Sequence, residues 1–361
     1  MKSVKHWINP AILTMQAYHV PSSAGLLKMD AMENPYTWPE DLRQKWLHEL
    51  EDIPVNRYPD AAAQTLKDKL RAVMLVPDNV SIMLGNGSDE LIQIIALALT
   101  RSDRTYLTLE PGFAMYRLIS QIVNAGFCSV LLNPEDFSLE RTAMLSAIKE
   151  QQPALIFIAY PNNPTGNLFD REIILDVIKH APGLVVIDEA YHAFAGASFM
   201  EYLDDFDNLL VMRTLSKSGL AGLRLGYLLG QRSWLDELDK IRLPYNINSL
   251  SQKTAEFILT HNEVLSDQAA QICRNREELL QQLMKIDGIK AWPSAANFIL
   301  FRTLELDATR VFTGLMHRGV LIKHLHGSHP ILQNCLRVTV GTEKDNAVFI
   351  DTLKQVIQSY H

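Results

Sequence analysis

Residues 184–191 read LVVIDEAY, four apolar residues followed at once by an acidic pair. An unbroken apolar run is typical of a strand that is buried on both faces of a sheet. A carboxylate at the end of such a strand is costly to bury unless it meets a cation or a hydrogen-bond donor. The stretch therefore predicts a buried strand that could carry Asp188 to a ligand. When the stretch is taken alone, a helix cap or a surface position is the better interpretation of Asp188.

Further apolar runs on both sides of this stretch alternate with segments of helical periodicity. They occupy residues 81–84, 105–109, 154–159, 209–212 and 224–229. Apolar strands separated by helices predict a largely parallel sheet that is covered by helices on both faces. Ligands of such sheets bind at the carboxyl ends of the strands, so the polar residues that follow these runs are the candidates for function.

The pattern changes after Pro244. A long helical stretch, about 252–286, leads into short strands at 297–301 and 335–340 and a final helix, which predicts a smaller α+β domain. The first 40 residues are rich in turn formers. We therefore expect an N-terminal arm (1–30) that packs on the small domain or on a partner subunit, a large domain (31–247) and a small domain (248–361).

Composition narrows the class of protein. The 361 residues are 47% hydrophobic and carry a net charge of −7, so nothing attracts nucleic acid or an anionic membrane in general, and a phosphate ligand needs a local positive site. The start of the chain lacks the apolar core of a signal peptide, and no apolar run reaches the length of a membrane span. The 3 cysteines form no CxxC pair, which indicates a reducing compartment. We expect a cytoplasmic protein.

The stretch GNGSDE (85–90) follows a predicted strand and precedes an amphipathic segment. Glycines permit a tight turn, and the start of a helix offers unpaired N–H groups to an anion. The stretch is a candidate phosphate cradle to which Ser88 adds a hydroxyl. Taken alone, an ordinary turn with Ser88 or Asp89 as the helix cap is the better interpretation.

Two further polar stretches follow predicted strands. The stretch YPNNPTG (160–166) can aim Asn163 at a ligand oxygen, because its prolines restrict the backbone. The stretch RTLSKSGLAGLR (213–224) places Lys217 among small and apolar residues, where loss of solvent lowers the pKa of a lysine and prepares it for Schiff-base chemistry. Hydroxyl and guanidinium groups suited to phosphate surround it: Thr214, Ser216 and Arg224.

Together these stretches meet the needs of pyridoxal phosphate: a phosphate cradle, an acid for the protonated pyridine nitrogen, donors to its phenolic oxygen and a lysine for the Schiff base. Over nearly its full length the chain resembles the class I/II aminotransferases, which are fold-type I pyridoxal-phosphate enzymes, and within them the histidinol-phosphate aminotransferases. The stretches that carry the resemblance are residues 30–36, 56–60, 85–90, 161–166, 188–191, 213–217 and 336–341.

The resemblance implies a large domain with a mostly parallel seven-stranded sheet between helices, a smaller α+β domain and a role for each residue. Lys217 would form the Schiff base and carry the proton, and Asp188 would pair with the pyridine nitrogen. Asn163 and Tyr191 would bond the phenolic oxygen. The phosphate would be surrounded by Ser88, Asp89, Thr214, Ser216 and Arg224.

The resemblance also implies a homodimer, because Tyr58 would reach the phosphate of the neighbouring subunit. Phe113 would stack on the cofactor ring. The implied reaction transfers the amino group of L-histidinol phosphate to 2-oxoglutarate, giving imidazole acetol phosphate and glutamate in histidine biosynthesis. The substrate contacts would come from Tyr18, Asn34, Lys323 and Arg337.

The chain departs from the family pattern at a few positions. Met32 stands where relatives usually carry Asn, and Phe113 where many carry Tyr. The 6 residues between Lys217 and Arg224 are one fewer than in many relatives. Lys323 often corresponds to Arg, which binds phosphate with a fork rather than a point charge. The last departure bears on the substrate and leaves the cofactor assignment intact.

Other functions stay open at this stage. An aromatic amino acid aminotransferase or a decarboxylase of a phosphorylated amino acid could share the scaffold. The ligand-sensing module of a transcription regulator would need a DNA-binding segment and a basic patch, and the sequence offers neither. His324, His326 and His329 invite a metal site, but no Cys or carboxylate joins them at ligand spacing, so we expect no metal.

Overall fold

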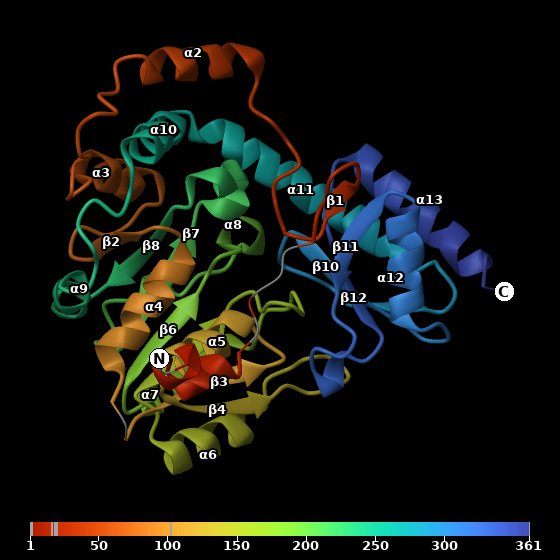
Figure 1. Cartoon of the computed structure of the whole chain (residues 1–361), viewed down its shortest axis with the longest axis horizontal. Coiled ribbons are helices and arrows are strands. Elements are labelled where there is room, and N and C mark those ends of the chain that lie inside the picture. The colour runs from red at the N-terminus through yellow and green to blue at the C-terminus, as the bar shows by residue number, and fades with distance from the viewer. Residues whose placement is uncertain (1–2, 16, 18–20, 102, 361) are drawn as a thin grey trace.

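The computed structural model describes residues 3–15, 17, 21–101 and 103–360. Two bodies stand side by side, each built on its own sheet (Figure 1). The larger contains a seven-stranded sheet and the smaller a five-stranded sheet. No helix in the ranges just given is both long and apolar enough to cross a lipid bilayer.

The large sheet has the strand order β2-β8-β7-β6-β5-β3-β4. Strand β8 runs antiparallel to both of its neighbours, whereas the other neighbouring pairs are parallel. The predicted fold class is thereby confirmed. The strands are β2 (Ser81–Gly85), β3 (Thr105–Glu110), β4 (Gly126–Leu131), β5 (Leu155–Ala159), β6 (Leu184–Asp188), β7 (Leu209–Thr214) and β8 (Gly226–Gly230).

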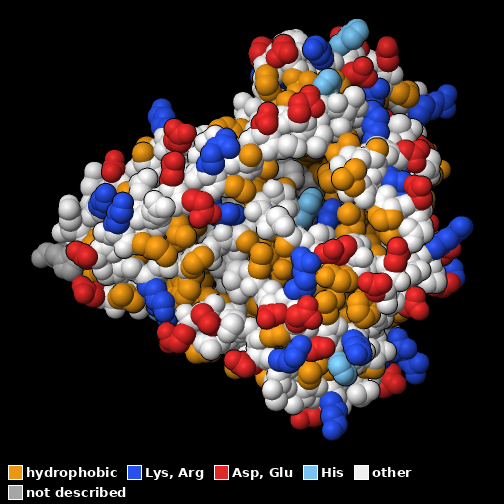
Figure 2. Space-filling view, turned by 180° about the vertical axis from the view of Figure 1, so that it is seen from behind, with side chains coloured by type: hydrophobic (Ala, Val, Ile, Leu, Met, Phe, Trp, Pro, Cys, Tyr) orange, Lys and Arg blue, Asp and Glu red, His pale blue; other side chains and the backbone are white. Residues whose placement is uncertain are grey.

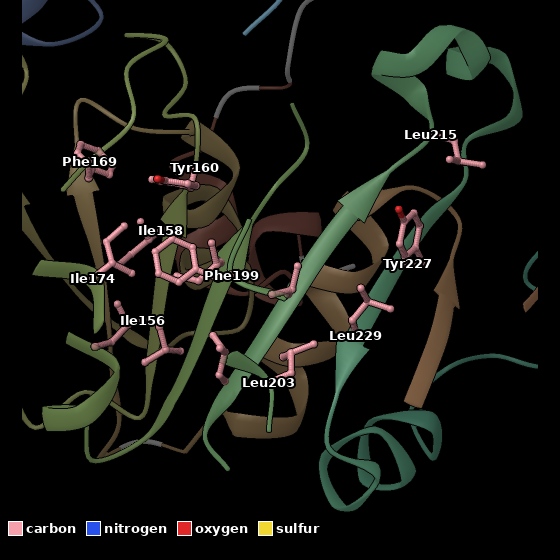
Figure 3. Packing of buried hydrophobic residues seen from close by; sticks show 14 of the residues in the cluster. Ile156, Ile158, Tyr160, Phe169, Ile174, Phe199, Leu203, Leu215, Tyr227 and Leu229 are labelled. Carbon is pink, nitrogen blue, oxygen red and sulfur yellow. The ribbon is translucent and has the colours of Figure 1, made fainter. Parts of the chain in front are cut away.

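Strand β6 explains why this sheet forms. Val185 and Ile187 join the hydrophobic core on one face, while Leu184 and Val186 join the core on the other. Burial of each such side chain stabilises the fold by roughly 1.5–3 kcal/mol, so an apolar residue is needed at every position. Figure 3 shows the core that contains Val185 and Ile187 from close by, with side chains of several strands packed together.

Helices of the large body cover the sheet and connect its strands. They are α2 (Glu40–Leu50), α3 (Gln64–Val73), α4 (Ser88–Leu99), α5 (Ala114–Ile122), α6 (Arg141–Gln151), α7 (Arg171–His180), α8 (His192–Ala195) and α9 (Arg232–Asp239), with the short turns η2 (Met200–Tyr202), η3 (Ser216–Leu220) and η4 (Ala221–Leu223). Strand β4 has no counterpart among the apolar runs, because it is a half-exposed edge strand that pairs with β3 alone.

The small sheet has the order β1-β11-β12-β10-β9. Strand β1 pairs in parallel with β11, and the remaining pairs are antiparallel. Lys323 on β11 lies opposite Arg337 on β12. The elements are β1 (Leu27–Met29), β9 (Ile289–Ala291), β10 (Phe298–Thr303), β11 (Val320–His324), β12 (Cys335–Thr339), α11 (Asn262–Leu283), α12 (Ala308–His317), α13 (Glu343–Gln358) and η5 (Pro330–Leu332).

The helical stretch expected at 252–286 is two helices, α10 (Ser249–Thr260) and α11, interrupted at His261. Helix α10 packs on α2 and α3, whereas α11 packs on α8 of the large body and on α13 and the small sheet. At the N-terminus, η1 (Val4–His6) precedes α1 (Pro10–Leu13), which lies on α5, and β1 joins the small sheet. The domain limits at residues 30 and 247 remain a proposal.

Candidate active site

A cavity at the carboxyl ends of the strands of the large sheet gathers most of the predicted cofactor residues. Besides Met32, Ala159 and Ala190, its wall contains Ser88, Asp89, Phe113, Asn163, Asp188, Tyr191, Thr214, Ser216, Lys217 and Arg224. The predicted cofactor residues among them come from segments between Ser88 and Arg224, spread over nearly 140 positions of sequence, and the strands bring them to one edge of the sheet.

Lys217 lies on the π-helical turn η3, directly after β7. Burial, together with the nearby cations Arg337 and Arg224, lowers the pKa of its amine to about 8. Its Nζ donates a hydrogen bond to the carbonyl oxygen of Ala31 at 3.3 Å. An amine with this pKa is available as a nucleophile and as a base near neutral pH.

Asp188 closes the buried end of the cavity, and its side chain is only 4% exposed. Burial raises the pKa of its carboxyl to about 6. The hydroxyl of Tyr116 donates to Oδ2 at 2.7 Å, and the backbone N–H of Ala190 donates to Oδ1 at 3.1 Å. A carboxylate at this position can pair with a cationic ring nitrogen.

An anion cradle lies at the start of α4. The helix begins at Ser88 behind Gly87, which provides no side-chain cap, so the first N–H groups of α4 have no capping partner from that residue. The hydroxyls of Thr214 and Ser216 lie 3.0 Å apart, and Nη1 of Arg224 donates to the Ser216 oxygen at 3.4 Å. Hydroxyls, a guanidinium and a helix start are the groups that bind phosphate.

The glycines around the cradle are required by close packing. A Cβ on Gly87 would lie 2.8 Å from Nη2 of Arg224, and a Cβ on Gly226 would lie 2.7 Å from the backbone N of Ser88. Asp89 orients the same guanidinium, since its Oδ2 lies 3.3 Å from Nη2 of Arg224. A side chain at Gly87 would therefore displace the Arg224 guanidinium from its present position.

A hydrogen-bonded chain connects the two bodies at the mouth of the cavity. Nδ2 of Asn163 donates to the Tyr191 hydroxyl at 3.1 Å, and Nη1 of Arg337 donates to Oδ1 of Asn163 at 2.5 Å. Burial raises the pKa of the Tyr191 phenol above its usual value, so this phenol stays protonated. Arg337 lies over the Phe298 ring at 4.9 Å and donates to the Asp30 carbonyl oxygen at 3.2 Å.

A second cavity adjoins the first between the two bodies. Met32, Asp89, Phe113 and Asn163 line both cavities, and Lys323 and Arg337 face the second. Two cations from neighbouring strands thus face a space that opens onto Lys217, which suits a small anionic substrate.

The remaining predicted residues lie outside both cavities or outside the described residues. The side chain of Tyr58 is 80% exposed and stacks on Tyr245 with ring centroids 4.4 Å apart. Nδ2 of Asn34 donates to Oε1 of Gln268 at 2.9 Å and Oδ1 of Asn34 accepts from the N–H of Tyr36, which ties down the segment before α2. Tyr18 lies outside the described residues, so its predicted role is untested.

Two residues of the site were not identified from the sequence. Tyr116 lies three residues after Phe113 on α5, a spacing that places both on one helix face and could have indicated it. Met32 was noted as a departure, but its place in both cavity walls depends on its left-handed backbone (φ 54°). Thr339 and Asn297 hold that backbone through hydrogen bonds of 3.0 and 2.9 Å.

Comparison with known proteins identifies the family. A family model described as aminotransferase class I and II matches residues 24–353. The chain belongs to this family. The resemblance predicted from the sequence is thereby confirmed.

Relatives within the class I and II aminotransferases match nearly end to end. Histidinol-phosphate aminotransferase 2 of Nitrosococcus oceani is 52% identical over 97% of both chains. Histidinol-phosphate aminotransferase 2 of Cupriavidus pinatubonensis is 47% identical over 98% of both. The crystal structure of histidinol-phosphate aminotransferase from Sinorhizobium meliloti in complex with pyridoxal-5'-phosphate matches with a TM-score of 0.86 and 22% identity over 98% of both chains, which establishes the fold.

Among residues with described positions, no three His, Cys, Asp or Glu side chains gather as a metal site. The rings of His324 and His326 lie 5.9 Å apart on and beyond β11. On the face shown in Figure 2, acidic and basic side chains are interspersed, and neither sign forms a broad patch.

Proposed function

We propose that this chain is a pyridoxal-phosphate-dependent aminotransferase that converts L-histidinol phosphate and 2-oxoglutarate into imidazole acetol phosphate and glutamate. The observation that carries the proposal is one cavity that combines a lysine of lowered pKa, a buried carboxyl and an anion cradle. The names of full-length relatives at 52% and 47% identity support the choice of substrate.

The cavity fits the cofactor group by group. The start of α4 with Thr214, Ser216 and Arg224 would hold the phosphate. Asp188 would pair with the ring nitrogen at the buried end. When bound, pyridoxal phosphate supplies a carbonyl carbon that accepts the amino group and a ring that accommodates the electron pair left by proton removal.

The donors on either side of the ring complete the fit. The Tyr191 hydroxyl and the Asn163 amide, already 3.1 Å apart, would bond the phenolic oxygen. Phe113 lines the cavity and would cover one face of the ring. The Asn163 amide also accepts from Arg337, so cofactor and substrate contacts are coupled through one side chain.

Lys217 would hold the cofactor covalently and carry the α-proton. A pKa of about 8 leaves roughly a quarter of such amines neutral at pH 7.5, against roughly one in a thousand for an ordinary lysine. Once the substrate amine has displaced it, the neutral Lys217 amine would accept the proton from the α-carbon and return it to C4′ of the cofactor. The Ala31 carbonyl oxygen accepts a hydrogen bond from Nζ of Lys217 and so orients the free amine.

Lys323 and Arg337 would bind the anionic end of each substrate. L-Histidinol phosphate carries a phosphate and no α-carboxylate, whereas glutamate carries carboxylates. The same pair of cations must therefore accept both anions in alternate half-reactions. Arg337 offers a bidentate fork and Lys323 a point charge, so the pair can adapt to either shape.

We infer that the active form is a cytoplasmic homodimer in which Tyr58 reaches the phosphate site of the partner. The segment around Tyr58 supports this, because Val55, Tyr58 and Leu243 are 78%, 80% and 72% exposed. Exposed apolar side chains of this size favour a protein partner. Molar mass in solution by light scattering tests the dimer, and a monomer at working concentration would contradict it.

The visible absorption spectrum of the purified protein with pyridoxal phosphate tests the function. L-Histidinol phosphate should convert the band of the covalently held cofactor to that of its amine form, and 2-oxoglutarate should restore it, with imidazole acetol phosphate as product. A band that responds only to phenylalanine would indicate an aromatic aminotransferase. Carbon dioxide release without use of an oxo acid would indicate a decarboxylase. The absence of any bound cofactor would refute the proposal.

A further inference from the structure

We propose that Tyr116 is a positioning residue whose hydroxyl fixes the orientation and the charge of the Asp188 carboxylate for the pyridine nitrogen of the cofactor. The proposal rests on the proposed function, because it concerns how the protein prepares the partner of that nitrogen. Tyr116 is thereby added to the site as a residue that would contact neither the cofactor phosphate nor the substrate.

The geometry leaves Tyr116 little freedom. Its side chain is 3% exposed, and its ring stacks on Phe157 of β5 with centroids 4.7 Å apart and planes 1° apart. Its hydroxyl lies 2.7 Å from Oδ2 of Asp188, the last residue of β6. Tyr116 on α5 therefore contacts both β5 and β6. An ionised carboxylate only accepts hydrogen bonds, so the phenol is the donor.

Tyr116 also supports the residue expected to cover the cofactor ring. Its ring meets that of Phe113 edge to face, with centroids 5.4 Å apart and planes at 87°. Edge-to-face aromatic pairs hold one another in a defined orientation. A single buried ring thus contacts both Asp188 and Phe113, which would meet the cofactor from the nitrogen end and from one face.

The charges around Asp188 show why a donor is needed. Burial disfavours the carboxylate, and the negative groups Asp89 and Glu189 disfavour it further. The cations nearest those two groups are engaged with them, since Arg224 pairs with Asp89 at 3.3 Å and Arg213 pairs with Glu189 at 2.9 Å.

Two hydrogen bonds oppose these effects, one from the Tyr116 hydroxyl and one from the Ala190 N–H, and of the two the Tyr116 bond lowers the pKa of Asp188 more. The Tyr191 phenol also faces this carboxylate and is held protonated by burial. Removing the Tyr116 hydroxyl should therefore raise the pKa of Asp188 above its present value of about 6.

The test is the affinity of the cofactor-free protein for pyridoxal phosphate as a function of pH. Tyr116→Phe keeps the ring and its packing but loses the donor. A hydrogen bond to a charged group is strong enough that its loss should weaken binding by roughly tenfold or more. The loss should grow from pH 8.5 to pH 6, because the variant carboxyl becomes neutral at a higher pH than the wild-type carboxyl.

Tyr106→Phe is the matched control. Tyr106 is also a buried tyrosine, 2% exposed, and its hydroxyl donates to the Ala96 carbonyl oxygen at 2.6 Å, away from the cavity. Its loss should leave both the affinity and its pH dependence as in the wild type. Thermal unfolding of the cofactor-free variants establishes that both fold.

The outcomes separate this inference from the proposed function. If the wild type does not bind pyridoxal phosphate, the proposed function fails. If the wild type binds and Tyr116→Phe binds equally well at every pH, or if Tyr106→Phe shows the same loss, the inference about Tyr116 is wrong.

Should Tyr116→Phe not fold, 3,5-difluorotyrosine at position 116 keeps the ring and provides a more acidic, stronger donor. It should tighten binding at pH 6 relative to the wild type. Unchanged binding would overturn the inference.

Discussion

Substitution of Gly87 by alanine should disable the phosphate cradle while the rest of the site stays intact. The new Cβ would lie 2.8 Å from Nη2 and 3.3 Å from Cζ of Arg224. Ordinary contact begins near 3.4 Å, so the guanidinium would have to withdraw by about 0.6 Å (from 2.8 to 3.4 Å). Its bonds to Ser216 and Asp89, at 3.4 and 3.3 Å, are already long and would break.

The expected magnitude follows from the contact that is lost. A charge-assisted hydrogen bond to phosphate is worth roughly 1.5–3 kcal/mol, so the affinity for pyridoxal phosphate should fall by roughly ten- to a hundredfold. Gly87 also has φ 84° and ψ 163°, a region that non-glycine residues occupy only at a cost of about 1–3 kcal/mol. Part of any loss of stability in Gly87→Ala would therefore come from backbone strain, which is separate from the loss of phosphate binding.

Gly196→Ala separates these two effects. Gly196 also has a positive φ (62°), but a Cβ there would meet nothing within 4 Å. Equilibrium titration of the cofactor-free proteins with pyridoxal phosphate measures the cofactor affinity, and thermal unfolding measures the stability. Gly196→Ala should lose some stability and keep its affinity. Wild-type affinity in Gly87→Ala would refute the reasoning about the cradle.

Further predictions concern three other residues. Cofactor-free Lys217→Met should be more stable than the wild type at pH 7, and its advantage should shrink as pH rises from about 8 towards 10.5. In that range the unfolded wild type still carries a charged Lys217, and the cost of releasing its proton on folding falls as pH approaches the unfolded pKa. A pH-independent difference in thermal unfolding would contradict this. The same variant should bind pyridoxal phosphate without turnover. Lys323→Ala should raise the KM for L-histidinol phosphate by roughly ten- to a hundredfold with a smaller change in kcat, and Lys323→Arg should restore it; an unchanged KM in steady-state assays would remove Lys323 from the substrate site. Tyr58→Phe should weaken cofactor binding in the dimer, and an unchanged cofactor titration would remove Tyr58 from the partner's phosphate site.

The sequence was most informative where local pattern and burial agree. The apolar runs at β5, β6 and β7 predicted strands correctly because each is buried on both faces. The polar residues that follow them were correctly expected at one place, since parallel strands end at the same edge. Strand β4 was missed because an edge strand that is half-exposed needs no apolar run.

The break at His261 was missed for a different reason. Helix α10 packs on α2 and α3 of the large body, whereas α11 lies between the two bodies, where it contacts α8 as well as α13 and the small sheet. These different packing partners are set by the tertiary structure, so the sequence pattern alone did not indicate the break.

What the sequence by itself determined is the set of chemical groups and the strands that carry them: Lys217, Asp188, Asn163 and the cradle each follow a segment whose structure is set by its own residues. What only the tertiary structure decided is how groups on separate elements act on one another. Arg337 reaches Asn163 across 174 positions of sequence, and Tyr116 reaches Asp188 across 72. Such contacts depend on how sheets and helices pack, and packing is a property of the whole core that no local pattern encodes.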